Sequence, residues 1–178
     1  VREAIVYAES KGVLLVNAAG NDGVNLDEVF SYPNDSFKNA PEVSSNFITI
    51  GAIGPVNNPL MVAPFSNYGK HNLDLFAPGA VIYAPVPSNK YQALSGTSMA
   101  APAVSGVAAI VLSYYSKLSP KAVRKALMES VVEINYELKL GYDRAETTMD
   151  AISQTGGIVN AYNALLYVSD HYKSLRKL

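Results

Sequence analysis

The stretch ALSGTSMAAPAVSG, residues 93–106, sets a small polar run directly before a long apolar segment. The apolar segment, Ala100–Tyr115, has almost no polar face and is rich in Ala, Gly and Ser, which predicts a helix in the middle of a domain. Pro102 is tolerated in the first turn of a helix, where its missing N–H costs little. The helix is therefore expected to begin within a few residues of Ser98.

Ser98 has two interpretations on position alone. A serine before a helix is most often an N-cap that accepts a hydrogen bond from the first turn. The free N–H groups and the positive end of the helix dipole also favour negative charge that develops beside it. Gly96, Ala100 and Ala101 leave little bulk around the hydroxyl, an opening that a cap does not require. These small neighbours favour a reactive hydroxyl.

Composition bounds the kind of protein. The 178 residues, 49% of them hydrophobic, suffice for a sizeable core in one domain or a large part of one. A formal net charge of -1 leaves no bulk field to attract nucleic acid or an anionic membrane, so neither is expected as a partner. No run of about 18 apolar residues appears, so no membrane span is expected. The lack of cysteine excludes disulfides and thiolate metal sites.

Short apolar runs alternate with helical and loop segments, as is typical of an α/β protein. A helical period over residues 1–12 precedes an apolar run at 13–16, which predicts a strand of a parallel sheet covered on both faces. Further strands are predicted at 47–53 and 73–76, and a hairpin at 81–94. Because the helical period runs from the first residue, we expect that upstream sequence is missing.

The last third of the chain predicts two more helices. Ser119 and Pro120 are typical of an N-cap and a first helical residue, and an apolar stripe follows them. Residues 137–157 are mixed and polar, which predicts a loop or insertion. A helical pattern resumes at Ile158–Leu166.

Two motifs carry a family resemblance. GTSMAAP at 96–102 resembles the nucleophile motif of the subtilisin-like serine proteases, the subtilases, and NAAGNDG at 17–23 is similar to their oxyanion-hole segment. The resemblance covers residues 1–134 and 156–166 and leaves 137–155 unmatched. Further segments match in the family's order: YP at 32–33, ITIGAIG at 48–54, FSNYG at 65–69, LDLFAPG at 73–79 and GGIVNAYNAL at 156–165.

The resemblance implies a fold and a set of roles. The fold would be the C-terminal portion of a three-layer α/β domain, with a mostly parallel sheet flanked by helices. Ser98 would attack the scissile carbonyl, and the Asn21 side-chain amide and the Ser98 N–H would stabilise the oxyanion. Ala18, Ala19 and Gly20 would line part of the S1 pocket. The alternatives are a turn role for Asn21 and simple packing at a strand end for the small residues.

The serine needs a base, and the base needs an orienting acid. In the subtilases these are a His and an Asp in motifs around HGTHVAG and DTG that precede the matched region, and neither motif occurs in these residues. His71 and His171 lie in polar or charged runs, where solvated surface histidines are expected, and Asp74 is interpreted as structural. Residues 1–178 are therefore expected to be the C-terminal part of a catalytic domain, inactive alone.

Two functions from different classes stay open. One is a fragment of a serine endopeptidase whose Asp and His lie upstream, and the other is a non-catalytic subtilase-like binding module, a pseudoprotease. The intact Ser98 and Asn21 favour the endopeptidase. Ala103, which stands where the family usually has His, bears on local packing rather than on the chemistry.

The resemblance also implies partners and a location. The partners would be a polypeptide substrate and the missing N-terminal part of the same domain, and the location would be secreted or in the cell envelope. No cofactor is expected for catalysis, and a structural calcium ion, common in the family, maps onto no acidic cluster here. Half of a doubly wound sheet would expose a strand edge, so self-association is a further expectation.

Overall fold

The computed structural model describes residues 1–36 and 40–175 of the chain. Its centre is a five-stranded sheet in the order β1-β2-β3-β9-β6, in which every neighbouring pair but the last is parallel. A mixed α/β architecture with a mostly parallel sheet confirms the predicted fold class. The strands are β1 (Leu15–Ala18), β2 (Phe47–Ile53), β3 (Leu75–Pro78), β9 (Gly157–Ile158) and β6 (Val132–Glu133).

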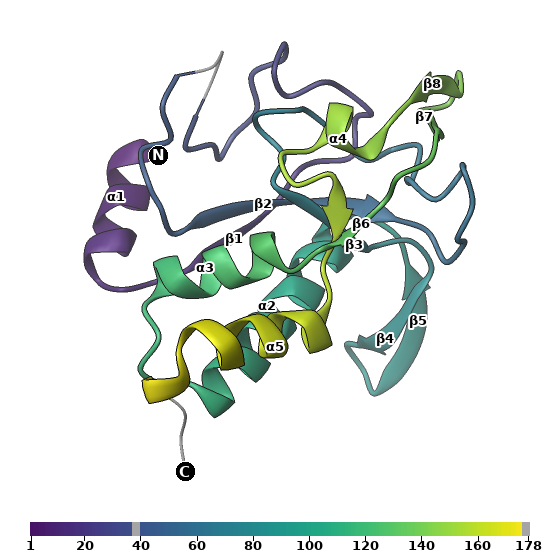
Figure 1. Cartoon of the computed structure of the whole chain (residues 1–178). Helices are drawn as coiled ribbons and strands as arrows, with labels where there is room; N and C mark the ends of the chain where they lie inside the picture. Colours follow the sequence, from purple (N-terminus) through teal and green to yellow (C-terminus); the bar gives the residue numbers. More distant parts are fainter. Residues whose placement is uncertain (37–39, 176–178) are drawn as a thin grey trace.

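Three helices cover one face of this sheet (Figure 1). They are α2 (Thr97–Tyr114), which contacts β1, β2 and β3, and the two helices packed against it, α3 (Pro120–Glu129) and α5 (Ala161–His171). Loops and short elements bury the opposite face. The short elements that contribute to it are β7 (Leu138–Leu140) and α4 (Met149–Ile152), and β8 (Ala145–Thr147) pairs with β7. The remaining elements are α1 (Arg2–Ser10) before β1, the hairpin of β4 (Ile82–Val86) and β5 (Lys90–Leu94), and the turn η1 (Lys173–Leu175).

Strand β2 shows why the sheet is buried on both faces. Side chains alternate between the two faces of a strand. Ile48 and Ile50 belong to the core under α2, whereas Ile53 belongs to a second core on the opposite face. Gly51 faces this second core, where a Cβ would lie 2.5 Å from the Phe76 ring. The continuous apolar run at 47–53 therefore reflects burial on both faces rather than a helix.

The element boundaries refine the sequence predictions. The β2 prediction is confirmed to the residue, whereas β1 and β3 each begin two residues later than predicted. Leu73 explains the difference at β3, because it is fully buried in the second core yet precedes the paired residues. An apolar pattern reports burial, and burial extends beyond the hydrogen-bonded ladder.

Two predictions near the C-terminus are only partly right, because the predicted helix begins later than expected and the segment predicted as a loop or insertion contains short elements. Residues 157 and 158 form β9, and α5 begins only at Ala161, after Asn160, whose side-chain oxygen accepts a hydrogen bond from Asn163 N. The segment expected to be a loop, residues 137–157, contains β7, β8 and α4. Its strands are three residues long, too short for a periodic pattern to stand out.

Helix α2 differs from its prediction at its start. It begins at Thr97, so Pro102 lies in the second turn rather than the first. Because proline has no N–H, the Ser98 carbonyl lacks its usual partner four residues along the helix. The first turn of α2, which carries Ser98, is thus joined to the rest of the helix by fewer hydrogen bonds than an ordinary turn.

One side of α2 is exposed, whereas the sequence predicted a helix surrounded by protein. Its opposite side packs on the sheet through Val104, Ala108 and Val111. By length and hydropathy alone, α2 is also the one helix among the described residues that could cross a membrane, but its contacts with three strands are those of a core helix. The exposed stripe consists of Pro102, Ser105, Gly106, Ala109, Ile110, Ser113 and Tyr114.

Candidate active site

Ser98 stands at the open start of α2. The chain reaches this point from β5 through Gly96, whose N–H donates to the Gly79 carbonyl at 2.8 Å. The Ser98 side chain is exposed, while its neighbours Thr97 and Ala100 are fully buried. Ser98 is therefore exposed at the positive end of an 18-residue helix, which favours negative charge that develops beside it.

Asn21 is fastened to the residue before this serine. Its Oδ1 accepts hydrogen bonds from Thr97 N at 2.9 Å and from Thr97 Oγ1 at 3.0 Å. The Thr97 hydroxyl in turn accepts from Gly20 N at 3.0 Å. With Oδ1 engaged, the Asn21 amide nitrogen is directed toward Gly96, 3.4 Å from the point where a Cβ of that glycine would stand. The structure thus brings the two motifs of the sequence together through Thr97, which the sequence analysis did not single out.

Asn67 holds the other side of the same loop. Its Oδ1 accepts from Asp22 N at 3.0 Å and Val24 N at 3.1 Å, and its Nδ2 donates to the Ala19 carbonyl at 2.9 Å. The side chain is 0% exposed. A Cβ at Gly20, where φ is +102°, would lie 2.5 Å from Asn67 Nδ2, so glycine is required there. The FSNYG segment at 65–69 was the sequence signal for this residue. We call residues 17–23 the oxyanion loop.

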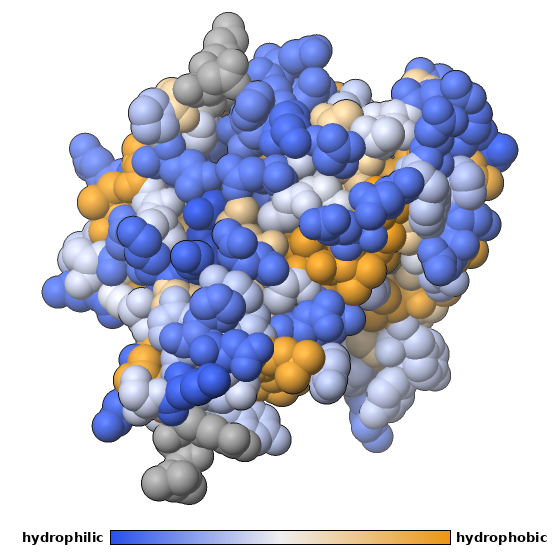
Figure 2. Space-filling model, in the orientation of Figure 1, coloured by the Kyte–Doolittle hydropathy of each residue, from blue (hydrophilic) through white to orange (hydrophobic). Residues whose placement is uncertain are grey.

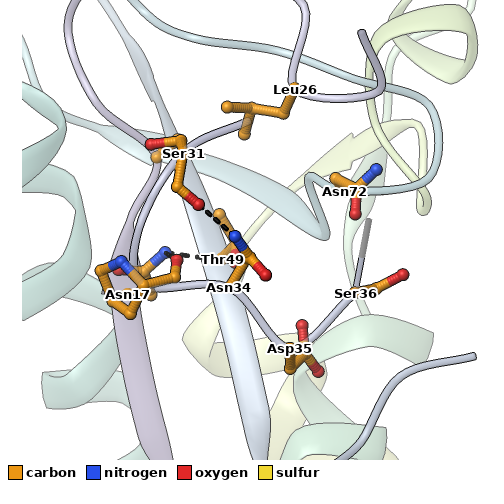
Figure 3. A pocket seen from close by; sticks show the side chains of 10 residues that line it. Asn17, Leu26, Ser31, Asn34, Asp35, Ser36, Thr49 and Asn72 are labelled. Atoms are coloured by element: carbon orange, nitrogen blue, oxygen red, sulfur yellow. Dashed lines mark hydrogen bonds between the residues drawn. The ribbon is translucent and has the colours of Figure 1, made fainter. Parts of the chain in front are cut away.

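A pocket opens beside the end of β1 (Figure 3). Of the three residues predicted to line an S1 pocket, Ala19 lines this one, Ala18 packs toward the core under α2, and Gly20 bonds Thr97. Their role toward a substrate stays a prediction. The polar side chains around the pocket are Asn17, Ser31, Asn34, Asp35, Ser36, Thr49 and Asn72.

Asp35, on the loop between β1 and β2, is a buried carboxyl. Its Oδ2 has no hydrogen-bond partner among the described residues. Burial, together with the charges of Glu42 and Asp74, raises the pKa of Asp35 to about 7. A carboxyl with this pKa is partly protonated near neutral pH, unlike an ordinary surface aspartate.

Arg124 of α3 ties two of these acids together. Its Nη2 donates to Asp74 Oδ1 at 2.6 Å and to Glu42 Oε1 at 2.9 Å, and Asp74 Oδ2 accepts from Thr49 N at 2.6 Å. Burial raises the pKa of Asp74 to about 6, although the Arg124 charge lowers it. These contacts join β2 to α3 and support the structural interpretation of Asp74. We call Asp35, Glu42, Asp74 and Arg124 the Arg124 cluster.

Both histidines are exposed, as the sequence predicted. His71 lies in a loop, where its backbone N–H donates to the Asp27 carboxylate, 3.2 Å from each oxygen. His171 ends α5, with its Nδ1 2.8 Å from the Tyr167 carbonyl. Over residues 1–36 and 40–175, no group of three or more His, Asp or Glu side chains that could hold a metal ion is found, and the calcium expectation stays a prediction.

Comparison with known proteins places this geometry in a family. Subtilisin DY of Bacillus licheniformis is 34% identical over 135 residues, which are 75% of this chain and 45% of that protein. Thermitase of Thermoactinomyces vulgaris is 34% identical over 172 residues, which are 94% of this chain and 49% of that protein. The chain therefore spans about half the length of these two relatives.

Solved structures and a family model agree with these relatives. The structure of the prenylagaramide maturation protease PagA matches with a TM-score of 0.69 and 28% identity, over 93% of this chain and 54% of that one. The model of the Subtilase family matches residues 1–160, a range that includes the oxyanion loop and the start of α2. This chain belongs to the subtilase family of serine peptidases.

Proposed function

We propose that this chain is the part of a serine endopeptidase that carries the nucleophile and the oxyanion hole. The Ser98 hydroxyl would attack the carbonyl carbon of a peptide bond and expel the amine, and water would then release the acyl group from the serine. Family membership supports a serine peptidase. The contact between Asn21 and Thr97 is the observation that supports Asn21 as an oxyanion donor and Ser98 as the nucleophile.

This contact suits an oxyanion hole because it directs the amide of Asn21. With both hydrogen bonds on Oδ1, the Nδ2 hydrogens remain to donate beside Gly96, two residues from the nucleophile. The Ser98 N–H, in the first turn of α2, would be the second donor. Donors fixed in advance stabilise charge that appears only in the transition state, which raises the rate without tightening substrate binding.

The base and its orienting acid would come from a part of the catalytic domain that precedes residue 1. Two faces of the chain suit such a part: the exposed stripe of α2, and the outer edge of β1, which pairs with β2 alone among the described strands. We therefore propose that residues 1–178 are the C-terminal part of the domain and hydrolyse nothing alone. Without the preceding part, the same faces favour self-association, which light scattering would detect as a mass above 19.0 kDa.

Hydrolysis of a fluorogenic peptide tests this function. The assay compares the protein that includes the sequence preceding Val1, its Ser98→Ala variant, and the 178-residue chain. We expect turnover by the longer protein, a loss of about 10⁴-fold or more in Ser98→Ala, and none by the chain alone. A folded longer protein without turnover, or one whose turnover survives Ser98→Ala, would instead favour the binding-module function.

Location and metal content are proposals with their own tests. We propose a secreted or cell-envelope location, which cell fractionation would check. Two relatives from Bacillus subtilis are named a cell wall-associated protease and a major intracellular serine protease. We propose that catalysis needs no cofactor. We also propose that the longer protein binds a structural calcium ion, so a chelator should lower its thermal unfolding temperature.

A further inference from the structure

Asn67 is a polar side chain enclosed by protein. Hydrophilic residues cover most of the surface at the top of Figure 2, over the loops above the sheet in Figure 1. Asn67 lies on one of these loops, between β2 and β3, yet it is 0% exposed. A buried amide costs free energy unless its donors and acceptors are paired, so its partners show what the burial serves.

The amide of Asn67 is matched to the oxyanion loop and the residue just after it. Its Oδ1 accepts from Asp22 N at 3.0 Å and from Val24 N at 3.1 Å, and its Nδ2 donates to the Ala19 carbonyl at 2.9 Å. A carboxylate has no N–H to donate, and an ammonium group has no acceptor. This set of backbone partners therefore suits an amide in particular.

The backbone of Asn67 bonds the same loop. Its N–H donates to the Gly20 carbonyl at 3.0 Å. The Gly20 carbonyl belongs to the peptide plane before Asn21, and the Asp22 N–H belongs to the plane after it. Because peptide bonds are planar, two torsion angles of Asn21 alone relate these planes. Asn67 thus holds both planes that flank Asn21 and fixes the direction in which its side chain leaves the backbone.

The segment that carries Asn67 is anchored to the sheet. Ser66 Oγ accepts from Ala52 N of β2 at 2.9 Å and donates to the Asn67 carbonyl at 3.0 Å. On the other side, Gly69 N donates to the Ile152 carbonyl of α4 at 3.0 Å. Asn67 is therefore fixed to a central strand of the fold, and it can hold the oxyanion loop in one place.

Thr97 and Asn67 hold opposite ends of Asn21. Thr97 bonds the side-chain oxygen, whereas Asn67 bonds the backbone on either side of the residue. With both ends held, the amide nitrogen is directed toward Gly96. An oxyanion donor is most effective when it is fixed before the charge develops, since no ordering then accompanies the reaction.

We propose that Asn67 is a positioning residue for the oxyanion hole. It fixes the backbone of Asn21 and so sets the direction of the amide that would stabilise the oxyanion. The inference rests on the proposed endopeptidase function and deepens it. The effect of Asn67 on the chemistry passes through Asn21, because the Asn67 bonds go to the backbone on either side of that residue.

Steady-state kinetics of the longer protein tests the role. Asn67→Leu keeps a similar volume and removes the three side-chain bonds to the backbone. We expect kcat to fall by about 10- to 100-fold with little change in KM, the size expected when a catalytic group is misplaced by about 1 Å. In a protein that already carries Asn21→Leu, the same change should lower kcat by less than about two-fold, because the amide through which Asn67 acts is gone.

Two further variants separate positioning from a general loss of stability. Asn160→Ala removes an asparagine that accepts a backbone N–H from Asn163 at the start of α5. It should lower the unfolding temperature but leave kcat within about two-fold of the parent. Asn67→Ser keeps a neutral polar group and leaves room for water, so kcat should fall by a smaller factor than in Asn67→Leu, about three-fold or more. Asn67→Ser decides the test if Asn67→Leu does not fold.

NMR of the 178-residue chain gives a readout that does not depend on catalysis. The side-chain amide signals of Asn21 are identified by their loss in Asn21→Leu. We expect Asn67→Leu, or Asn67→Ser in its place, to shift these signals toward those of a freely rotating amide. The backbone amide signal of Asn163, at the start of α5, should stay in place.

Two results would overturn the proposal. One is a folded Asn67 variant whose kcat equals that of the parent, or whose loss in kcat is equally large in the Asn21→Leu background. The other is a set of Asn21 amide signals that does not move when Asn67 is changed. A longer protein that hydrolyses nothing would remove the endopeptidase function, whereas the Asn21 signals would still decide whether Asn67 positions that amide.

Discussion

The oxyanion loop and the Arg124 cluster lie at the same sheet and are held in opposite ways. Neutral groups hold the loop: Thr97 and Asn67 pair with its amides and carbonyls at 2.9 to 3.1 Å. Charged groups hold the cluster, where one guanidinium donates to Asp74 and Glu42, and Asp35 Oδ2 has no partner within the part of the chain that the structure describes. The difference teaches that a site can be positioned independently of pH while the scaffold beside it is not.

Removal of the guanidinium should have the largest effect on stability. Arg124→Ala removes the guanidinium that pairs with the buried Asp74 and with Glu42, and the charges of both acids act on Asp35. We expect the free energy of unfolding at pH 7 to fall by about 3 to 5 kcal/mol, as for other buried pairs that lose one partner. Urea unfolding measures it. The control Lys125→Ala changes the exposed neighbour and should shift stability by less than about 0.5 kcal/mol. Equal effects of the two changes would contradict the cluster's role.

Removal of the oxyanion amide should affect the rate instead. In the longer protein, Asn21→Leu should lower kcat by about 10² to 10³, the loss known for removal of one such donor in a subtilisin. KM should change little, because the donor acts only when the oxyanion forms. Steady-state kinetics on a peptide substrate measures both. A rise in KM with unchanged kcat would place Asn21 in substrate binding rather than in the oxyanion hole.

Loss of the Thr97 hydroxyl should have a smaller effect on both properties. Thr97→Val keeps the shape and one hydrogen bond to Asn21, from the backbone N–H, but leaves Gly20 N without a partner. We expect the free energy of unfolding to fall by about 1 to 2 kcal/mol. We expect kcat to fall by a much smaller factor than in Asn21→Leu. Thr97→Ser, which restores the hydroxyl, should recover most of both. Failure of serine to do so would mean that packing of the methyl group holds the loop.

The smallest expected effect is a change in the free energy of unfolding with pH, which the Arg124 cluster should cause and the oxyanion loop should not. Burial raises the pKa of Asp35 from 3.8 to about 7, so the folded state binds this proton more tightly than the unfolded state. The free energy of unfolding should therefore fall as pH rises from about 4 to about 7. Asp35→Asn should remove part of this fall and be more stable than the parent at pH 8 by about 1 kcal/mol or more, with no difference at pH 4. Urea unfolding at the two pH values checks it, and a parent less stable at pH 4 than at pH 8 would contradict it.

The sequence could predict the motif residues but not their supports. Ser98 and Asn21 lie in motifs whose order matches the family. The mostly apolar run at 47–53 predicts β2, and all seven of its residues are buried. Thr97 and Asn67 act on residues 76 and 48 positions away, and Arg124 pairs with residues 50 and 82 positions away. The FSNYG match marks the segment that holds Asn67, but the partners of these side chains depend on the finished fold. The β7 and β8 hairpin was missed because its strands are shorter than a detectable period.

Covalent labelling tests the central claim most directly. A fluorophosphonate reacts only with an activated serine, and mass spectrometry of the digest identifies the residue that carries it. We predict label on Ser98 in the longer protein, none in its Ser98→Ala variant and none in the 178-residue chain. Label on another serine, or a folded longer protein that takes up no label, would contradict the assignment of Ser98 as the nucleophile.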